Sequence, residues 1–207
     1  MKKLASTLPN MLLSLVGICL VVAALLGAMY KLTEAPIKLS KEAAKSEAIS
    51  KVIVGMDDKT ELSEESFTLD GDKDEVVVYT ARKEGEVIGY AVQSFADGFG
   101  GKISEMVGLD PEGKLVDFVE LENAETPGLG TKIPEWFGES EKAGKGKGCI
   151  KGIDMDEVKE LKVTKDGGSV DAITAATISS RAFLGAVNRA YKAYLQTLSN
   201  QSEGGNK

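Results

Sequence analysis

The N-terminal part of the chain contains one long apolar run. No charged residue occurs from Leu4 to Tyr30, and the stretch from Met11 to Met29 is almost entirely apolar. About 20 apolar residues in a helix span the roughly 30 Å hydrocarbon core of a bilayer. A cleaved signal peptide has a shorter apolar region that ends in a small-residue cleavage site, and this run matches that pattern poorly. The pattern predicts a retained transmembrane helix over 11–30.

After this run the pattern becomes that of a soluble segment. Residues 31–37, which contain Pro36, indicate a short linker. From 39 to 54, apolar residues recur at spacings of three and four, which is typical of an amphipathic helix. Residues 57–74 are polar and charged and predict a loop. We therefore expect a linker and an amphipathic helix over 31–74.

Strand signals fill the next part of the chain. β-Branched and aromatic residues gather in four segments joined by short links that contain Gly or Pro, namely 75–82, 86–95, 102–109 and 114–121. Successive strands with hairpin-length links favour an antiparallel sheet over alternating βα units. Neither a strand–GxGxxG–helix unit nor a GxxxxGK[ST] loop occurs, so the sequence indicates neither a dinucleotide fold nor a P-loop.

The remaining segment combines glycine-rich loops with a final helix. Six glycines lie within 128–148, where we expect a helical turn at 134–137, and 155–163 predicts another strand. Residues 178–198 predict a helix, because their apolar side chains form one stripe: Phe183, Val187, Ala190, Tyr191, Tyr194 and Leu198. The fold class is therefore α+β, an antiparallel sheet with flanking helices. The predicted organisation is a tail (1–10), a transmembrane helix (11–30), a linker and amphipathic helix (31–74), a folded domain (75–200) and a frayed tail (201–207).

Composition and charge exclude several classes of function. The 207 residues carry a net charge of -7 without basic clusters, which argues against binding to nucleic acid. The chain has no histidine, so imidazole-ligated haem or zinc and histidine-based catalysis are excluded. Its two cysteines, Cys19 and Cys149, form no CxxC pair that could hold an iron–sulfur cluster. Any redox centre is then organic, or uses metals held by carboxylates and carbonyls. We assign no metal site and no catalytic residue.

One segment carries candidate chemistry. The glycine-rich loop 166–168 leads into 171–179 (DAITAATIS), just before the final helix. Its small residues permit a close approach to the backbone, and Thr174 and Thr177 offer hydroxyl groups. The start of a helix also presents unpaired N–H groups and the positive end of the helix dipole, which favour a phosphate. The alternative is an ordinary N-cap.

Two motifs then carry a resemblance to a known family. The pattern D-x-x-[ST]-x-A-T at 171–177 resembles the acceptor motif of flavin transferases, which move FMN from FAD onto a threonine hydroxyl. The segment 125–130 (ETPGLG) and the GFGG loop at 98–101 look like further signatures of the same proteins. On these grounds the chain resembles the G-subunit family of the Rnf ion-translocating electron-transport complex. The domain at 75–200 is then an FMN-binding domain.

The resemblance implies a covalent cofactor, FMN, held by a phosphoester on Thr177. The implied cofactor-binding residues are Asp171, Thr174, Ala176 and Thr177 in one motif and Glu125, Thr126, Gly128, Leu129 and Gly130 in the other. The usual S-G-A-T core stands here as Thr174-Ala175-Ala176-Thr177, and we expect the added methyl group to be a small change. The two glycines of ETPGLG would let backbone N–H groups reach the flavin ring, and Glu125 would bond the ribityl hydroxyls. For Trp136 and Phe99, both stacking on the ring and a core role stay open.

The resemblance also implies a function. It is that of an electron-transfer subunit in a membrane-bound oxidoreductase, ferredoxin:NAD or NADH-linked, without a complete catalytic site of its own. The implied partners are other membrane and peripheral subunits, a flavin transferase and membrane lipid. Three alternatives remain: a flavin-bearing membrane regulator, the C-subunit of a sodium-translocating NADH:quinone reductase, and a binding module without cofactor in which Thr177 is only a cap. The short chain favours the Rnf family over the quinone-reductase family.

The charges beside the apolar run do not decide its orientation. Lys2 and Lys3 precede the run, and four lysines follow it within 31–45. Large domains cross a membrane largely regardless of their charge. We therefore expect a cytoplasmic N-terminus and an extracytoplasmic flavin domain at the inner (cytoplasmic) membrane, the side that the resemblance also implies.

Overall fold

The computed structural model describes residues 7–69, 75–138 and 148–204. The chain forms two compact units, Met1–Ala44 and Lys45–Lys207. Lys2 and Lys3, on which part of the topology prediction depends, lie outside the described residues.

The first long element is a single helix, α1 (Leu8–Val52). Its most apolar stretch has a mean hydropathy of 2.7 and no buried residue, so by length and composition α1 is able to cross a membrane. The predicted linker at 31–37 is wrong, because α1 continues through Pro36. A proline removes one helical hydrogen bond, but the flanking residues still make theirs, and a helix can continue through such a position with a bend.

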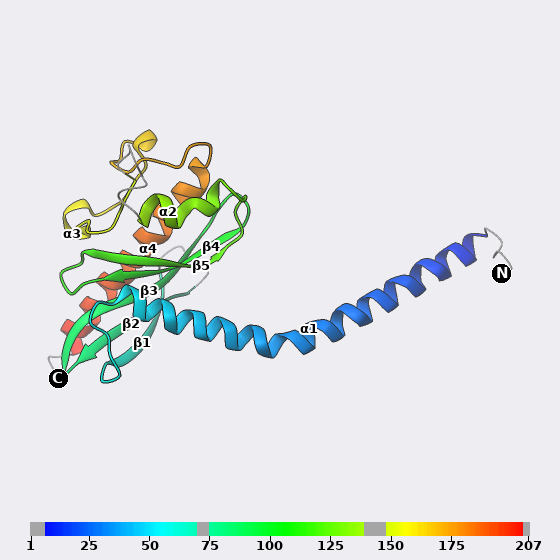
Figure 1. Ribbon diagram of the computed structural model, residues 1–207, viewed down its shortest axis with the longest axis horizontal. Coiled ribbons are helices and arrows are strands. Elements are labelled where there is room, and N and C mark those ends of the chain that lie inside the picture. Colours follow the sequence, from blue (N-terminus) through cyan, green and yellow to red (C-terminus); the bar gives the residue numbers. More distant parts are fainter. Residues whose placement is uncertain (1–6, 70–74, 139–147, 205–207) are drawn as a thin grey trace. The chain divides into compact units, whose positions relative to one another are not determined.

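The second unit is built on a five-stranded antiparallel sheet whose strands pair in chain order (Figure 1). The strands are β1 (Glu61–Thr68), β2 (Glu75–Lys83), β3 (Glu86–Asp97), β4 (Lys102–Leu109) and β5 (Leu115–Asn123). The four predicted strands are confirmed. The predicted loop at 57–74 is wrong in part, because it contains β1. This strand lies at the edge of the sheet, and Phe67 is its only buried residue, so its sequence lacks the apolar alternation of a buried strand.

One face of the sheet is covered by the last helix, α4 (Thr177–Gly204), which packs on β2, β3 and β4. The predicted stripe is confirmed: Phe183, Val187, Ala190, Tyr191 and Tyr194 are buried, and Leu198 packs against them. The ring of Phe183 lies 4.6 Å from that of Phe137 and 4.7 Å from that of Phe118, measured between centroids. This core fixes the position of the N-terminus of α4.

The opposite face of the sheet is covered by the end of α1. Ala48, Ile49 and Val52 are buried there, as expected for the apolar face of the predicted amphipathic helix. The contact is close at Gly108 of β4, where an added Cβ would lie 2.3 Å from the carbonyl oxygen of Val52. Helix and strand can therefore approach only because this residue has no side chain.

Short elements complete the domain: η1 (Gly130–Lys132), α2 (Ile133–Gly138), α3 (Met155–Val158) and η2 (Thr164–Asp166). The helical turn predicted at 134–137 is confirmed by α2. The strand predicted at 155–163 is wrong, because Asp154 caps α3 by accepting hydrogen bonds from the backbone N–H groups of Asp156 and Glu157. This cap stabilises a helical turn at a position where the strand pattern is weak. The α+β fold class is confirmed.

Candidate functional site

The N-terminus of α4 begins at a tight turn. Ala175 has a φ of 62°, in the left-handed region that favours glycine. The backbone N–H of Ala176 then donates to the carbonyl of Ile173 at 3.0 Å. Ser180 closes the turn from within the helix, since its hydroxyl accepts from the N–H of Ile173 and donates to the carbonyl of Ala176. The turn presents Thr177 half-buried at the first position of the helix.

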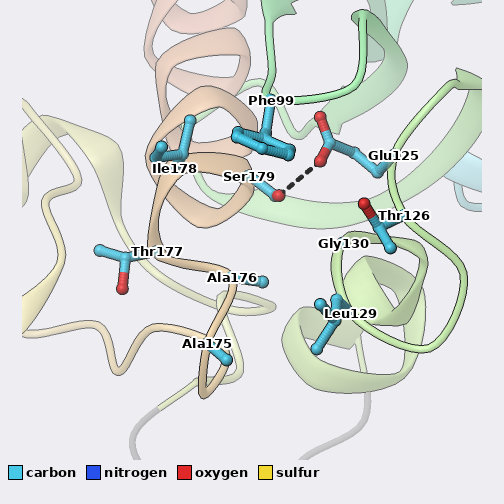
Figure 2. Close-up of a pocket in the computed structure, with 10 residues that line it drawn as sticks. All are labelled: Phe99, Glu125, Thr126, Leu129, Gly130, Ala175, Ala176, Thr177, Ile178 and Ser179. Atoms are coloured by element: carbon cyan, nitrogen blue, oxygen red, sulfur yellow. Dashed lines mark hydrogen bonds between the residues drawn. The ribbon is translucent and has the colours of Figure 1, made fainter.

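A cavity of about 410 Å³ lies beside this turn (Figure 2). Its walls come from the β3–β4 loop, the segment after β5 and the start of α4. The lining residues are Phe99, Glu125, Thr126, Leu129, Gly130, Ala175, Ala176, Thr177, Ile178 and Ser179. Its apolar side chains are open to solvent: Phe99 is 70% exposed, Ile178 51% and Leu129 38%. A cavity of this size with an apolar rim is suited to a flat organic ligand.

Glu125 lies in one wall of this first cavity and forms hydrogen bonds with residues of the other two walls. The residue is 5% exposed, and its carboxylate accepts a hydrogen bond from the Ser179 hydroxyl at 2.6 Å (Figure 2). The carboxylate also accepts a hydrogen bond from the Gly100 N–H at 3.1 Å. An added Cβ at Gly98 would lie only 2.0 Å from one of its oxygens, so the glycine loop closes tightly around it. The carboxylate thus bonds within the protein, and its predicted contact with ribityl hydroxyls stays a prediction.

The ETPGLG segment is only partly in the first cavity. Four of its residues line the cavity, Glu125, Thr126, Leu129 and Gly130, and Gly128 is absent from the lining. The N–H of Gly128 donates to the hydroxyl of Thr131 at 2.9 Å, and its φ of 78° makes the turn. That N–H is therefore engaged in a local bond. Gly130 is the close-approach position, because an added Cβ would lie 2.5 Å from Glu125 and 2.7 Å from the Ser179 oxygen.

A second cavity, of about 360 Å³, lies on the other side of Thr177. Its lining residues are Trp136, Thr164, Lys165, Asp171, Ala172, Ile173, Thr174, Ala175 and Thr177. Trp136 is half-buried, and its indole N–H donates to the backbone carbonyl of Asp171 at 2.8 Å. Of the predicted acceptor motif, Asp171 and Thr174 line this cavity, Ala176 lines the first, and Thr177 lines both.

Two acidic residues, one buried and one half-buried, pair across neighbouring strands of the sheet. Glu105 of β4 is 0% exposed and stands opposite Glu120 of β5. Burial, and then the charge of Glu120, raise the pKa of the Glu105 carboxyl well above its usual range. Burial also raises the pKa of Glu120, although a hydrogen bond from Asn123 at 2.5 Å opposes that rise. Asn123 in turn accepts a hydrogen bond from the backbone N–H of Glu125 at 2.8 Å. Asn123 therefore connects Glu120 to a residue that lines the first cavity.

Comparison with known proteins shows the family to which the chain belongs. The chain is 33% identical over 166 residues to the G-subunit of the ion-translocating oxidoreductase complex of Shewanella piezotolerans, covering 77% of this chain and 76% of that protein. It is 31% identical over 186 residues to the protein of the same name from Methanosarcina acetivorans, covering 87% and 91%. The chain belongs to this G-subunit family. The predicted resemblance is confirmed.

A family model and a further relative agree with membership of the G-subunit family. The family described as FMN-binding domain matches residues 98–192, a range that contains the lining residues of both cavities. A G-subunit protein of Haemophilus influenzae is 37% identical over 131 residues, and this chain spans 58% of its length. Among solved structures, the C-subunit of the Na⁺-translocating NADH-quinone reductase from Parabacteroides distasonis is 21% identical with a TM-score of 0.39, covering 58% of this chain and 61% of that one.

The residues present fit the FMN that an FMN-binding domain of the G-subunit family implies. Gly130 lets the cavity wall pack directly against Glu125 and Ser179, and the exposed Phe99 and Leu129 offer apolar surface to a ring. Phe99 thus lies at the first cavity rather than in the core, whereas Trp136 lines the second cavity and also packs against the core. The Thr177 hydroxyl lies where an anion is favoured, at the start of a 28-residue helix.

Two features of this G-subunit site were not predicted from the sequence. Lys165 reaches Thr177 from η2, and its Nζ donates to the Thr177 Oγ1 at 3.2 Å. In the sequence, the only indication of this contact was a basic residue in the loop that precedes the acceptor motif. The expectation for Ala175 also needs correction, because the methyl group is not a small change at a positive φ. The usual S-G-A-T core has a glycine at the position of Ala175, and that glycine indicated a backbone with a positive φ.

Proposed function

We propose that this chain is the electron-transfer subunit of an ion-translocating oxidoreductase complex and carries FMN esterified to Thr177. The proposal rests on family membership together with one observation about the site. Within the acceptor motif, Ala175 and Thr177 line both cavities, and of these two only Thr177 has a nucleophilic oxygen.

The surroundings of Thr177 suit an ester more than a simple helix cap. A capping hydroxyl would turn back to accept N–H groups of the first helical turn. Here the Thr177 hydroxyl instead accepts a hydrogen bond from Lys165, and the side chain points away from Glu125, Thr126 and Leu129 (Figure 2). The hydroxyl is therefore available to an incoming phosphate, next to the unpaired N–H groups that begin α4.

The bound flavin supplies the redox chemistry, since it passes one or two electrons. The chain's own residues would hold the flavin in place. Glu125 and Ser179 fix the wall of the first cavity, and Phe99 and Leu129 would cover apolar ring surface. Among the described residues we identify no base or nucleophile arranged to act on a second substrate, so the chain serves as a relay between partner subunits rather than as an enzyme alone.

The test of this proposal is intact-mass measurement of the full chain purified from membranes. We expect the wild type to carry an added mass of roughly 440 Da, the mass of esterified FMN. Thr177→Ala should lack it, because no other residue stands at the acceptor position. Thr164→Ala is the matched control, since Thr164 is an exposed threonine that also lines the second cavity but lies outside the acceptor motif. Flavin fluorescence that persists on denatured Thr177→Ala would refute the attachment site.

The proposed setting is a membrane complex with the flavin domain outside the cytoplasm. The apolar part of α1 provides the anchor, and the relatives' names place them in a multi-subunit complex, so other subunits are the expected partners, with a flavin transferase needed for maturation. The orientation is testable at Ser202, which is exposed near the end of α4. A membrane-impermeant thiol reagent should label Ser202→Cys in intact cells whose outer membrane, if present, is permeabilised. Labelling only after lysis would place the domain in the cytoplasm.

A further inference from the structure

Lys165 is a charged residue at the site that the family motifs do not account for. It belongs to η2, is exposed, and lines the second cavity beside Thr164 and Asp171. Its Nζ lies 3.2 Å from the Thr177 Oγ1, the atom that the proposed function makes the point of attachment. The ammonium group is therefore one hydrogen bond away from the reacting oxygen.

The fold holds the backbone of Lys165 against the start of α4. Arg181, one turn into α4, forms two hydrogen bonds with the carboxylate of Asp166, at 2.6 and 2.7 Å. The segment is closed behind by the pairing of Val163 with Val170. At Gly168 an added Cβ would lie 2.0 Å from the carbonyl oxygen of Lys162, so the loop can take this tight path only with a glycine at that position. The position of Lys165 is thus set by the neighbouring residues and not only by its own flexible side chain.

The direction of the Thr177 side chain defines where a phosphate would begin. The side chain points away from the Glu125–Leu129 side of the first cavity (Figure 2), and its oxygen faces Lys165. A phosphorus atom bonded to this oxygen would therefore stand on the Lys165 side. A phosphodiester keeps one negative charge, and a lysine ammonium is a suitable partner for it as a point charge. Asp171 lines the same cavity, and a cation there favours an anionic ligand beside this acidic residue.

We propose that Lys165 binds the phosphate of the flavin ester and holds the Thr177 hydroxyl in position for its formation. This rests on the proposed function. In the transfer, the Thr177 oxygen forms a bond to the FMN phosphorus of FAD, and the pyrophosphate bond to AMP breaks. The hydroxyl proton is released to AMP or solvent, and no electron moves. Lys165 offsets the charge of the phosphate both as it arrives and in the finished ester.

The experiment measures the rate of flavin attachment to the full chain in detergent. Apo chain is incubated with a purified flavin transferase and FAD, and the gain of roughly 440 Da is followed by intact mass. Lys165→Met should lower the maximal rate on the order of tenfold, the loss expected for one charge-assisted hydrogen bond. Lys165→Arg should restore most of it, because the charge returns. The concentration of chain at half-maximal rate should stay unchanged, since binding to the transferase is not the step affected.

Lys162→Met is the matched control. Lys162 is exposed in the same loop, pairs with Glu160 at 2.8 Å and does not line the second cavity. Its loss removes the same charge without touching Thr177, so its rate should equal that of the wild type. If Lys165→Met also equals the wild type, or if Lys162→Met is equally slow, the role of Lys165 is refuted. If the wild type gains no mass, or Thr177→Ala gains it, the proposed function itself fails instead.

Discussion

The buried acid Glu105 gives the sharpest prediction about stability. Glu105 is 0% exposed, and neither of its carboxylate oxygens has a hydrogen-bond partner among the described residues. Burial and the charge of Glu120 favour the neutral acid and raise its pKa well above the usual range. The folded state thus binds the proton of the Glu105 carboxyl group more tightly than the unfolded state does. Replacing Glu105 by Gln removes the ionisation and keeps the shape of the side chain.

The sign of the effect follows from linkage between proton binding and folding. The contribution of Glu105 to stability is complete below its unfolded pKa, about 4.3, and is lost as the pH rises toward the folded pKa. Within that interval the free energy of unfolding falls by about 1.4 kcal/mol for each pH unit. Glu105→Gln should therefore match the wild type near pH 4 and become progressively more stable than it above pH 5.

The assay is denaturant unfolding of the full chain in detergent at several pH values, followed by the fluorescence of Trp136, its only tryptophan. The difference in free energy between the two proteins should grow with pH. Glu112→Gln is the control, since Glu112 is exposed in the β4–β5 turn and its replacement should leave the pH dependence unchanged. A constant difference between Glu105→Gln and the wild type across the whole pH range would show that the buried acid does not ionise as argued.

Three further variants test the packing around the site. Ala175→Gly should stabilise the domain by about 1 kcal/mol and raise its melting temperature by about 2–4 °C, because it relieves a positive φ; an unchanged melting curve would contradict this. Gly108→Ala should destabilise it by about 1–3 kcal/mol, because the new Cβ collides with the carbonyl of Val52; wild-type stability in urea would show that α1 yields easily. Ser179→Ala should cost about 1–3 kcal/mol by removing a donor to Glu125, yet leave the flavin attached, which mass measurement checks.

The sequence by itself determined the elements with strong periodic patterns. The apolar run in α1, four strands of the sheet and the stripe of α4 were predictable because burial imposes a regular spacing on apolar residues. The family was also predictable, since the two motifs and their order are carried by short contiguous segments that need no tertiary information.

Two features that the sequence did not reveal depend on backbone hydrogen bonds rather than on apolar spacing. β1 is a polar edge strand that exists through its pairing with β2, and α1 continues through Pro36 because the flanking turns keep their hydrogen bonds. Such features leave little trace in local composition.

The site divides in the same way. The acceptor motif and the ETPGLG segment were found as strings, but only the tertiary structure showed that Glu125 is engaged by Ser179, 54 residues away in the chain. It likewise placed Lys165 beside Thr177 and gave Gly128 a place in a turn instead of a cavity wall. A sequence motif shows which residues a site uses. The direction of each hydrogen bond in the site is set by the packing of β5, η2 and α4 around the two cavities. That packing depends on the whole fold, so local sequence does not show it.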